Sequence, residues 1–287
     1  VSIGNIAGNG TLGLNLVDNN SIRDTAGNPL DQLNSSNYSF QSQQTYGTSN
    51  QPYAVAVADL NNDGKADLFA YDTDHISVFF GTASGQFSTT ADITVANSAG
   101  VTAVGVVRDL NGDGRPDLVI GDPSVGAYVF FGRATWPASL DLAAADKVIQ
   151  GVNSFGLLTI SVHSIVSVPD VDGDGKNELL LGDPGNQALY FCTGANVTSM
   201  PSGPVTNFAT AAPTYSPNDF GVALAVLDVN YDGRLDLVGG PNTLVGTPAW
   251  FVQDASHNFG PAVSLGQVGS NFGVAIAAGD VSADTKA

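Results

Sequence analysis

The feature that most constrains this chain is an acidic nine-residue pattern that recurs at intervals of about 50 to 60 residues. Its clearest copy, at 109–117, reads Asp-Leu-Asn-Gly-Asp-Gly-Arg-Pro-Asp. Side-chain oxygens at positions one, three, five and nine, with glycine at position six, suit a Ca²⁺ ion that takes about 6–8 oxygen ligands. The ninth residue runs directly into Leu-Val-Ile, an apolar run that predicts a β-strand. The pattern therefore predicts a calcium loop between two strands.

Four complete copies of this pattern supply the candidate metal ligands. Position seven of each copy offers its backbone carbonyl, in addition to the four side-chain positions. The candidates are Asp59, Asn61, Asp63, Lys65 and Asp67 in the first loop; Asp109, Asn111, Asp113, Arg115 and Asp117 in the second; Asp170, Asp172, Asp174, Lys176 and Glu178 in the third; and Asp228, Asn230, Asp232, Arg234 and Asp236 in the fourth. A fifth copy with Asp280, Ser282 and Asp284 is incomplete, because Thr285 replaces the glycine and the ninth position would lie beyond residue 287. We therefore predict about four Ca²⁺ sites.

A metal-free turn rich in Asp and Asn is the alternative interpretation of each loop. Such a turn needs only one or two of these residues, whereas the loops repeat a full ligand set at fixed offsets. Mg²⁺ fits less well, because it prefers fewer protein oxygens and strict octahedral geometry. Glu178 is longer than the closing Asp of the other loops, so the third site is predicted to coordinate its ion differently.

Composition agrees with a folded β protein whose acidity is concentrated in these loops. The chain is 43% hydrophobic and 13% charged, with 34 glycines, which is typical of a turn-rich globular fold. The formal net charge is −18, and more than half of the 27 acidic residues lie in the five loops. Four bound Ca²⁺ ions would leave a charge of about −10, which disfavours nucleic acid and anionic membranes as partners. No apolar run of about 18 residues is present, so membrane insertion is not expected.

The apolar segments around the loops follow one order in each unit. In the first unit, one strand is predicted over 53–58, a second over 67–71 and a third over 76–80, before Gly81. The second unit repeats this order over 101–107, 118–120 and 127–131, before Gly132. Short strands at even spacing with glycine turns are typical of β-propeller blades.

The residues that flank the loops resemble those of a known family. Phe155-Gly156, Phe220-Gly221 and Phe272-Gly273 precede first strands, and Gly121-Asp-Pro123, Gly182-Asp-Pro184 and Gly240-Pro241 follow second strands. With the loops between them, residues 47–287 resemble the FG-GAP repeat of integrin α-subunit propellers and the related VCBS-type repeats of secreted bacterial proteins. The first two units depart from this pattern, with Pro52-Tyr53 and Ala99-Gly100 in place of Phe-Gly. The resemblance implies an all-β propeller of four-stranded antiparallel blades, with four full repeats and a truncated fifth.

Residues 1–46 have a different pattern and are predicted to form a separate segment. The stretch 10–30 resembles the last strands of bacterial Ig-like domains, and a β-hairpin at the edge of the propeller is the alternative. Propellers of the resembled family usually have about seven blades, so the visible repeats are fewer than a closed ring needs. We expect either a longer chain that closes the propeller or a head-to-tail assembly in which one molecule's N-terminal strands complete the last blade of the next.

No motif in the sequence indicates catalysis. His75, His163 and His257 are scattered, and the acids belong to the loops, so neither a zinc site nor a glycosidase pair can be picked out. Cys192 lies in an apolar run and is predicted to be a buried, inert thiol. Trp136 and Trp250, with Tyr128, Tyr190 and Tyr215, are predicted to pack in the core, with a sugar-stacking platform as the alternative.

These observations predict a non-enzymatic, calcium-binding structural or adhesion module of a bacterial surface or matrix protein. Its expected partners are protein or glycan ligands at the cell surface, or copies of itself. An extracellular location is expected, because modest-affinity calcium sites fill at about 10⁻⁴–10⁻³ M calcium. The alternative is a carbohydrate-binding or accessory propeller domain of a secreted enzyme.

Overall fold

The computed structural model describes most of the chain between residues 44 and 264. The described residues are 44–48, 51–52, 54–72, 75–96, 100–153, 156–158, 162–183, 188–199, 204–205, 220–241, 249–255, 259–260 and 263–264. The chain divides into two units, Val1–Thr45 and Tyr46–Ala287, and nearly all the described residues belong to the second. The predicted Ig-like strands and the incomplete fifth loop with Asp280, Ser282 and Asp284 lie outside the described residues.

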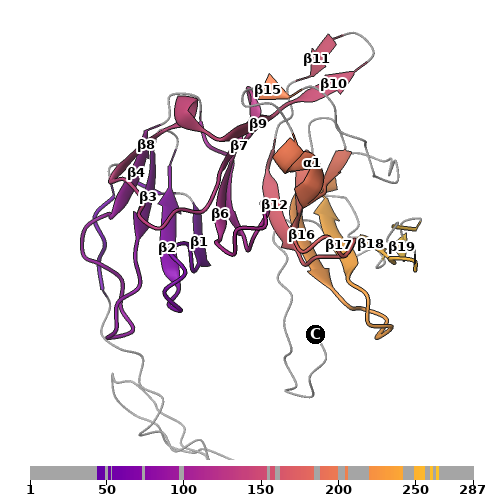
Figure 1. Cartoon of the computed structure of the whole chain (residues 1–287), viewed down its shortest axis with the longest axis horizontal. Helices are drawn as coiled ribbons and strands as arrows, with labels where there is room; N and C mark the ends of the chain where they lie inside the picture. Colours follow the sequence, from indigo (N-terminus) through magenta and orange to yellow (C-terminus); the bar gives the residue numbers. More distant parts are fainter. Residues whose placement is uncertain are drawn as a thin grey trace, which may run out of the picture. The chain divides into compact units, whose positions relative to one another are not determined.

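Among the described residues, four main sheets follow one another along the chain, one for each complete loop (Figure 1). The first contains β1 (Ala54–Ala58), β2 (Asp67–Tyr71), β3 (His75–Phe79) and β4 (Ile93–Ala96); the second β5 (Ala103–Val107), β6 (Asp117–Asp122), β7 (Gly126–Phe130) and β9 (Lys147–Ile149); the third β12 (Ser164–Val168), β13 (Glu178–Asp183) and β14 (Ala188–Cys192); the fourth β16 (Phe220–Leu227), β17 (Asp236–Pro241), β18 (Ala249–Phe251) and β19 (Val263–Ser264). Within each sheet these strands pair antiparallel in chain order. The all-β fold class predicted from the sequence is confirmed.

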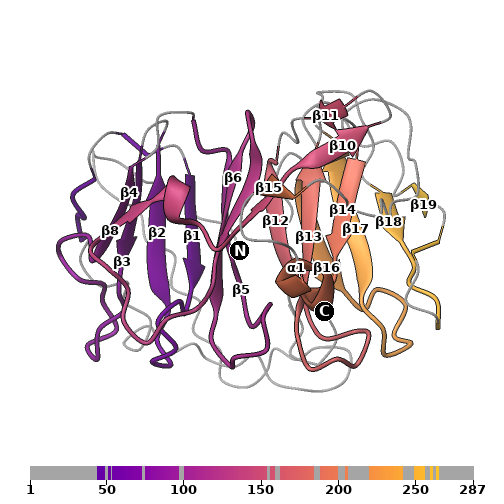
Figure 2. The same cartoon turned by 45° about the horizontal axis from the view of Figure 1, so that its top comes forward.

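The remaining elements are short. They are a hairpin of β10 (Gly151–Asn153) and β11 (Gly156–Leu158), the 3₁₀-helix η1 (Leu142–Ala144), the α-helix α1 (Gly194–Ser199), and two added edge strands, β8 (Ser139–Asp141) and β15 (Pro204–Val205). Figure 2 shows the strands of the third and fourth sheets standing side by side. Contacts between β5 and β12, and between β12, β13 and β16, join consecutive sheets.

The hydrophobic core lies in layers between consecutive sheets. All six residues of β6 are buried, because alternate side chains point to opposite faces and both faces are covered. Leu118 and Ile120 belong to the cluster shared with the first sheet, and Val119 belongs to the cluster shared with the third. β13 divides its leucines between its two neighbours in the same way. Burying each such side chain stabilises the fold by about 1.5–3 kcal/mol, so the sheets depend on one another.

Two edge strands reach back from one repeat to the sheet of the repeat before it. β8 follows β7 of the second repeat but pairs parallel with β4 of the first, with Val95 opposite Leu140 (Figure 1). β15 follows α1 of the third repeat but pairs parallel with β9 of the second. An edge strand covered in this way no longer presents free backbone groups. The sequence did not predict these two strands.

A glycine two residues after the third strand brings that strand against the loop. It is Gly81, Gly132 and Gly194 in the first three repeats, whereas Gln253 holds this position in the fourth. A Cβ atom on Gly132 would lie 2.4 Å from the Cβ of Arg115 and 2.7 Å from the carbonyl oxygen of Pro116. This position is therefore too close to the loop for a side chain.

Replacing Gly132 by Ala is predicted to lower the free energy of unfolding by about 1–3 kcal/mol, because overpacking forces the loop and strand apart. Urea denaturation measures this loss. Gly260→Ala is the control, because a Cβ there would meet its nearest atom, the carbonyl oxygen of Val252, at 3.4 Å. Equal losses in the two variants would contradict the close-approach explanation.

Candidate metal sites

Each of the four loops turns sharply at its fourth and sixth residues. The sixth residue is always glycine with positive φ, between 79° and 85°. The fourth residue is also left-handed, with φ of 82° at Gly112 and 80° at Gly173, but 59° at Asn62 and 60° at Tyr231. Glycine and asparagine adopt this conformation readily, whereas tyrosine does so at a cost. The conserved geometry shows that one loop conformation is used four times within the described residues.

Side-chain oxygens in each loop face inward and collect backbone N–H groups. In the second loop, Asp109 Oδ1 accepts from Asp113 N at 3.0 Å, and Asp109 Oδ2 accepts from Gly114 N at 2.8 Å. Asn111 Oδ1 also accepts from Asp113 N, and Asp113 Oδ1 accepts from Arg115 N. The other three loops repeat these bonds at their corresponding positions. The predicted ligands at positions one, three and five are therefore held by the loop's own backbone.

The closing acid at position nine is fully buried at the first residue of the second strand. In the second loop, Asp117 Oδ2 accepts from Leu110 N at 2.6 Å and Oδ1 accepts from Gly132 N at 2.7 Å. Asp67 makes the same two kinds of bond, and so does Asp236, with Gln253 N as the second donor. The acid thus joins the start of the loop to the end of the third strand. A carboxylate has about four lone-pair sites, so these bonds leave capacity for a cation.

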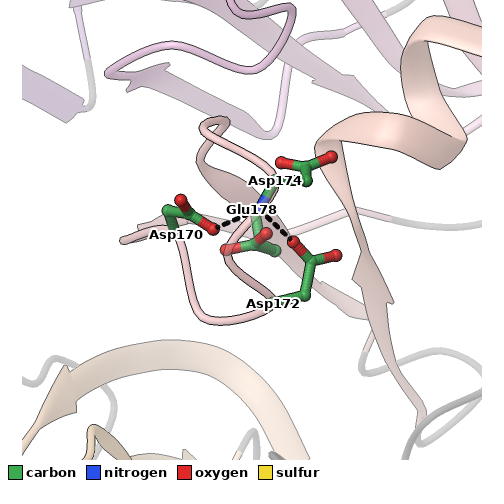
Figure 3. A group of neighbouring side chains, drawn as sticks. All are labelled: Asp170, Asp172, Asp174 and Glu178. Atoms are coloured by element: carbon green, nitrogen blue, oxygen red, sulfur yellow. Dashed lines mark hydrogen bonds between the residues drawn. The ribbon is translucent and has the colours of Figure 1, made fainter.

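The third loop differs because its closing residue is Glu178. Glu178 Oε2 accepts from Val171 N at 3.1 Å, but Oε1 is buried without a hydrogen-bond partner. One ligand oxygen from each of Asp170, Asp172, Asp174 and Glu178 lies within 4.8 Å of the others. Figure 3 shows these four side chains around a single loop, with Asp174 N bonded to Asp170 and Asp172. Within the described residues, this is the group of acids whose geometry suits a metal ion.

Burial raises the pKa of the closing acids in the first three loops. The pKa of Asp117 rises to about 7 because the carboxyl is desolvated, and the pKa of Glu178 rises to about 7 for the same reason, with Asp170, Asp172 and Asp174 adding repulsion. Burial also raises the pKa of Asp67. These values describe the metal-free protein, in which a buried negative charge has no nearby cation to offset it.

In the absence of metal, the stability of the protein is predicted to fall as pH rises from about 4 to about 7. A raised native pKa means that the folded chain keeps protons on Asp117 and Glu178 which the unfolded chain releases in this window. Thermal unfolding in chelator at several pH values measures the slope. Saturating calcium should reverse it, because the ion competes with these protons. A chelated protein that becomes more stable toward neutral pH would contradict the assignment.

Basic residues at position seven pair with the acid at position five in three loops. The ion pairs are Lys65 with Asp63 at 2.8 Å, Lys176 with Asp174 at 3.1 Å, and Arg234 with Asp232 at 2.5 Å. The pair with Lys65 lowers the pKa of Asp63. Exposed ion pairs of this kind contribute little stability. A divalent ion that binds the position-five carboxylate would therefore displace the Lys or Arg side chain at little cost.

All twenty predicted ligand residues lie within the described part of the chain. The structure brings oxygens of four acids within 4.8 Å of one another in the third loop, at Asp170, Asp172, Asp174 and Glu178. That these residues bind calcium stays a prediction.

Sequence reasoning missed the acids Asp92 and Asp146, which lie just before the fourth strands of the first and second sheets. They accept from Phe80 N and Phe131 N, both at 2.8 Å, and so fix the end of the third strand. The dipeptide Ala-Asp before the fourth strand of the first and second sheets was the available signal.

The cysteine and two of the aromatic residues discussed in the sequence analysis are buried. Cys192 is buried, and burial raises the pKa of its thiol, which agrees with an inert role. Trp136 is 8% exposed and packs in the core between the first and second sheets, so it is not a free platform for a sugar. Tyr190 is also a core residue, and Tyr215 lies outside the described residues.

The comparisons with known proteins identify the family. The model of the FG-GAP-like repeat matches residues 19–70, 59–120 and 170–239, which together make up more than half of the chain. The chain therefore belongs to the FG-GAP-like repeat family, as its flanking motifs predicted.

Several curated proteins are similar to part of the chain. Phosphatidylinositol-glycan-specific phospholipase D of Bos taurus is 30% identical over 155 residues, which cover 46% of this chain and 18% of that protein. Integrin alpha-PS5 of Drosophila melanogaster is 29% identical over 160 residues, which cover 48% of this chain and 15% of that protein. The chain thus spans less than a fifth of the length of these relatives.

Two solved structures also show some likeness. The crystal structure of BBS1N in complex with ARL6DN, soaked with lead, matches with 14% identity and a TM-score of 0.46, covering 75% of this chain and 57% of that one. The biofilm matrix protein Bap1 of V. cholerae matches with 17% identity and a TM-score of 0.37, covering 72% and 27%. In the part of the chain that the structure describes, no helix has the length and apolarity needed to cross a membrane.

Proposed function

We propose that the four loops bind Ca²⁺ and that the chain is a non-enzymatic, calcium-stabilised propeller module with a structural or adhesive role outside the cell. The observation that carries the proposal is the buried Oε1 of Glu178, which has no protein partner although three further carboxylates surround it. A buried charge without a partner costs several kcal/mol. A cation in the loop would supply the missing partner.

The donor set supports calcium in particular. Carboxylate, amide and backbone carbonyl oxygens are hard ligands, and the loop offers more of them than Mg²⁺ usually accepts from a protein. The third loop has four carboxylates, whereas each of the others has three carboxylates and an asparagine. More negative charge in the ligand set raises affinity for calcium. We therefore expect the third loop to bind calcium most tightly.

The extracellular assignment rests on the metal and on the relatives. Modest-affinity calcium sites fill at the millimolar calcium found outside cells. Integrin alpha chains of flies and mammals are among the similar proteins, which favours a role at a surface, with protein or glycan ligands. The match to a phospholipase D favours a second candidate, an accessory propeller domain of a secreted enzyme. A catalytic domain elsewhere in the same polypeptide would favour this second function.

Calcium is predicted to raise the melting temperature strongly, and a chelator to lower it. Each filled site adds about 2.7 kcal/mol at a hundredfold excess of calcium over its Kd. Glu178→Gln should weaken the third site about tenfold or more, because it removes one of four carboxylates. Glu178→Asp, which installs the closing residue of the other loops, is the matched control and should bind more tightly than Glu178→Gln.

Isothermal titration calorimetry measures these affinities, and differential scanning calorimetry measures the stabilities. A melting temperature that is indifferent to both calcium and chelator would reject the calcium sites. Equal calcium affinities in wild type and Glu178→Gln would reject the role of Glu178.

We further propose that the outer face of the first sheet packs against another repeat of the same kind. In a solution of this chain, a second copy would supply that repeat. Val55 and Val57 of β1 are 65% and 60% exposed. Their neighbours Ala56 and Ala58 face the core of the first and second sheets, so the valines point away from it. The second and third sheets are covered on both faces by neighbouring sheets. On the outer face of the first sheet Ala70, Ser77 and Phe79 are buried, and the exposed valines lie at the β1 edge.

The double variant Val55→Ser/Val57→Ser is predicted to reduce self-association, because it removes the apolar surface that another sheet would cover. Sedimentation velocity over a range of concentrations measures this. Wild-type protein that stays monomeric at every concentration would contradict the assembly.

A further inference from the structure

A short hydrogen bond joins the second and third loops. Asn177 N donates to the carbonyl oxygen of Asp109 at 2.6 Å. Asn177 is the eighth residue of the third loop, and Asp109 is the first residue of the second. Resting on the proposal that both loops bind calcium, we propose that this bond couples the two sites, so that an ion in one loop strengthens the binding of an ion in the other.

The bond begins at a peptide group that also faces the third site. The N–H of Asn177 and the carbonyl of Lys176 belong to one planar peptide unit. The Lys176 carbonyl is the predicted backbone ligand of the third loop, and Glu178, with its unpaired buried oxygen, follows Asn177 directly. A cation held by these groups fixes the orientation of the same peptide unit that donates to the second loop.

The bond ends at the residue that organises the second loop. The carboxylate of Asp109 accepts from Gly112 N at 2.7 Å, as well as from Asp113 N and Gly114 N. Holding the carbonyl of Asp109 therefore positions the side chain around which the second loop folds. The predicted ligands Asn111 and Asp113 are held in turn by that fold.

Further close contacts press the two loops together. The side chain of Lys176 lies beside Gly112, where a Cβ atom would come within 3.3 Å of Lys176 Cγ. A Cβ atom on Gly194 would lie 2.5 Å from Lys176 Cβ and 2.7 Å from the carbonyl oxygen of Leu110. The third loop thus cannot change shape at Lys176 without moving against the first half of the second loop.

Two effects make the contact a route for coupling. A cation bound to the Lys176 carbonyl polarises its peptide group and makes the Asn177 N–H a stronger donor. An ordered third loop also holds the second loop in its binding shape, so the second ion orders fewer residues when it binds. The coupling is reciprocal by thermodynamic necessity, and the affinity change must be the same in both directions.

The sequence excludes the same link between the first and second loops. The eighth residue of the second loop is Pro116, which has no N–H and so cannot make the same bond to the first loop. The first and second loops are joined instead by Asn62 Nδ2, which donates to the Gly114 carbonyl at 3.4 Å. That bond is long and starts from an exposed side chain, so we expect weaker coupling there.

The test is a calcium titration of the full chain followed by nuclear magnetic resonance, with the amide signals of Gly114 and Gly175 reporting the second and third sites separately. Asp174→Ala removes a ligand of the third site and should weaken calcium binding at Gly114 by about five- to tenfold. Asp113→Ala should weaken binding at Gly175 by the same factor. Equal affinity at Gly114 in wild type and Asp174→Ala would overturn the coupling.

Two variants at position 177 isolate the hydrogen bond. Asn177→Pro removes the N–H and copies the residue that the second loop already carries at this position, and it should bring the coupling factor close to one. Asn177→Ala keeps the N–H but removes the side-chain bond from Nδ2 to the Val168 carbonyl, and it should retain the coupling. If Asn177→Pro retains the full factor, the bond is not the route. If Asn177→Pro does not fold, the reciprocal pair Asp174→Ala and Asp113→Ala still decides whether the sites are coupled.

The outcomes separate this proposal from the one on which it rests. If both glycine signals respond to calcium but with affinities independent of the other site, the calcium sites stand and the coupling is wrong. If neither signal responds at millimolar calcium, the calcium sites themselves are wrong and the coupling fails with them.

Discussion

The structure depends on burying a carboxylate at the first residue of each second strand. Removing a charge from water is costly unless hydrogen bonds and an opposite charge replace the lost hydration. In three loops two backbone N–H groups do part of this, one from the loop's second residue and one from the residue two positions after the third strand. The same carboxylate thus ties three separate parts of the blade together. In the second loop, burial raises the pKa of this carboxylate, which is the sign that the compensation is incomplete without a cation.

The layered core determines where the loops lie. Because β6 and β13 bury both faces, each sheet is fixed against its two neighbours. The loops all leave their sheets between the first and second strands, so stacking the sheets also brings successive loops into contact, as the bond between Asn177 and Asp109 shows. The apolar second residue of the loop reinforces this arrangement: Leu60 and Leu110 are both buried in the layers between sheets.

The sequence predicted the parts of the fold that depend on local patterns. An acid followed by an apolar run located β2 at Asp67–Tyr71 with both ends correct, and the loop pattern located all four turns. It could not predict β8 and β15, because their parallel pairing joins short segments of two different repeats and leaves no periodic signal. Side-chain length marked Glu178 as different in the sequence, and the different coordination predicted from it stays a prediction. The unpaired oxygen depends on where Gly194 and Val171 lie in three dimensions. The Ig-like segment stays a prediction, since it lies outside the described residues.

Differences between the repeats are concentrated where the closing acid meets the third strand. In the first two repeats this acid is Asp and its partner is a glycine N–H, whereas in the fourth the partner is Gln253, whose carbonyl also accepts from Arg234 Nε at 3.1 Å. In the third, Glu178 extends by one methylene and leaves an oxygen free of backbone partners. An oxygen without a competing N–H donor can give more of its electron density to a cation than one already engaged. Four loops with nearly the same pattern therefore offer a cation unequal sites, and the inequality is set by residues that a search for the loop pattern alone would not include.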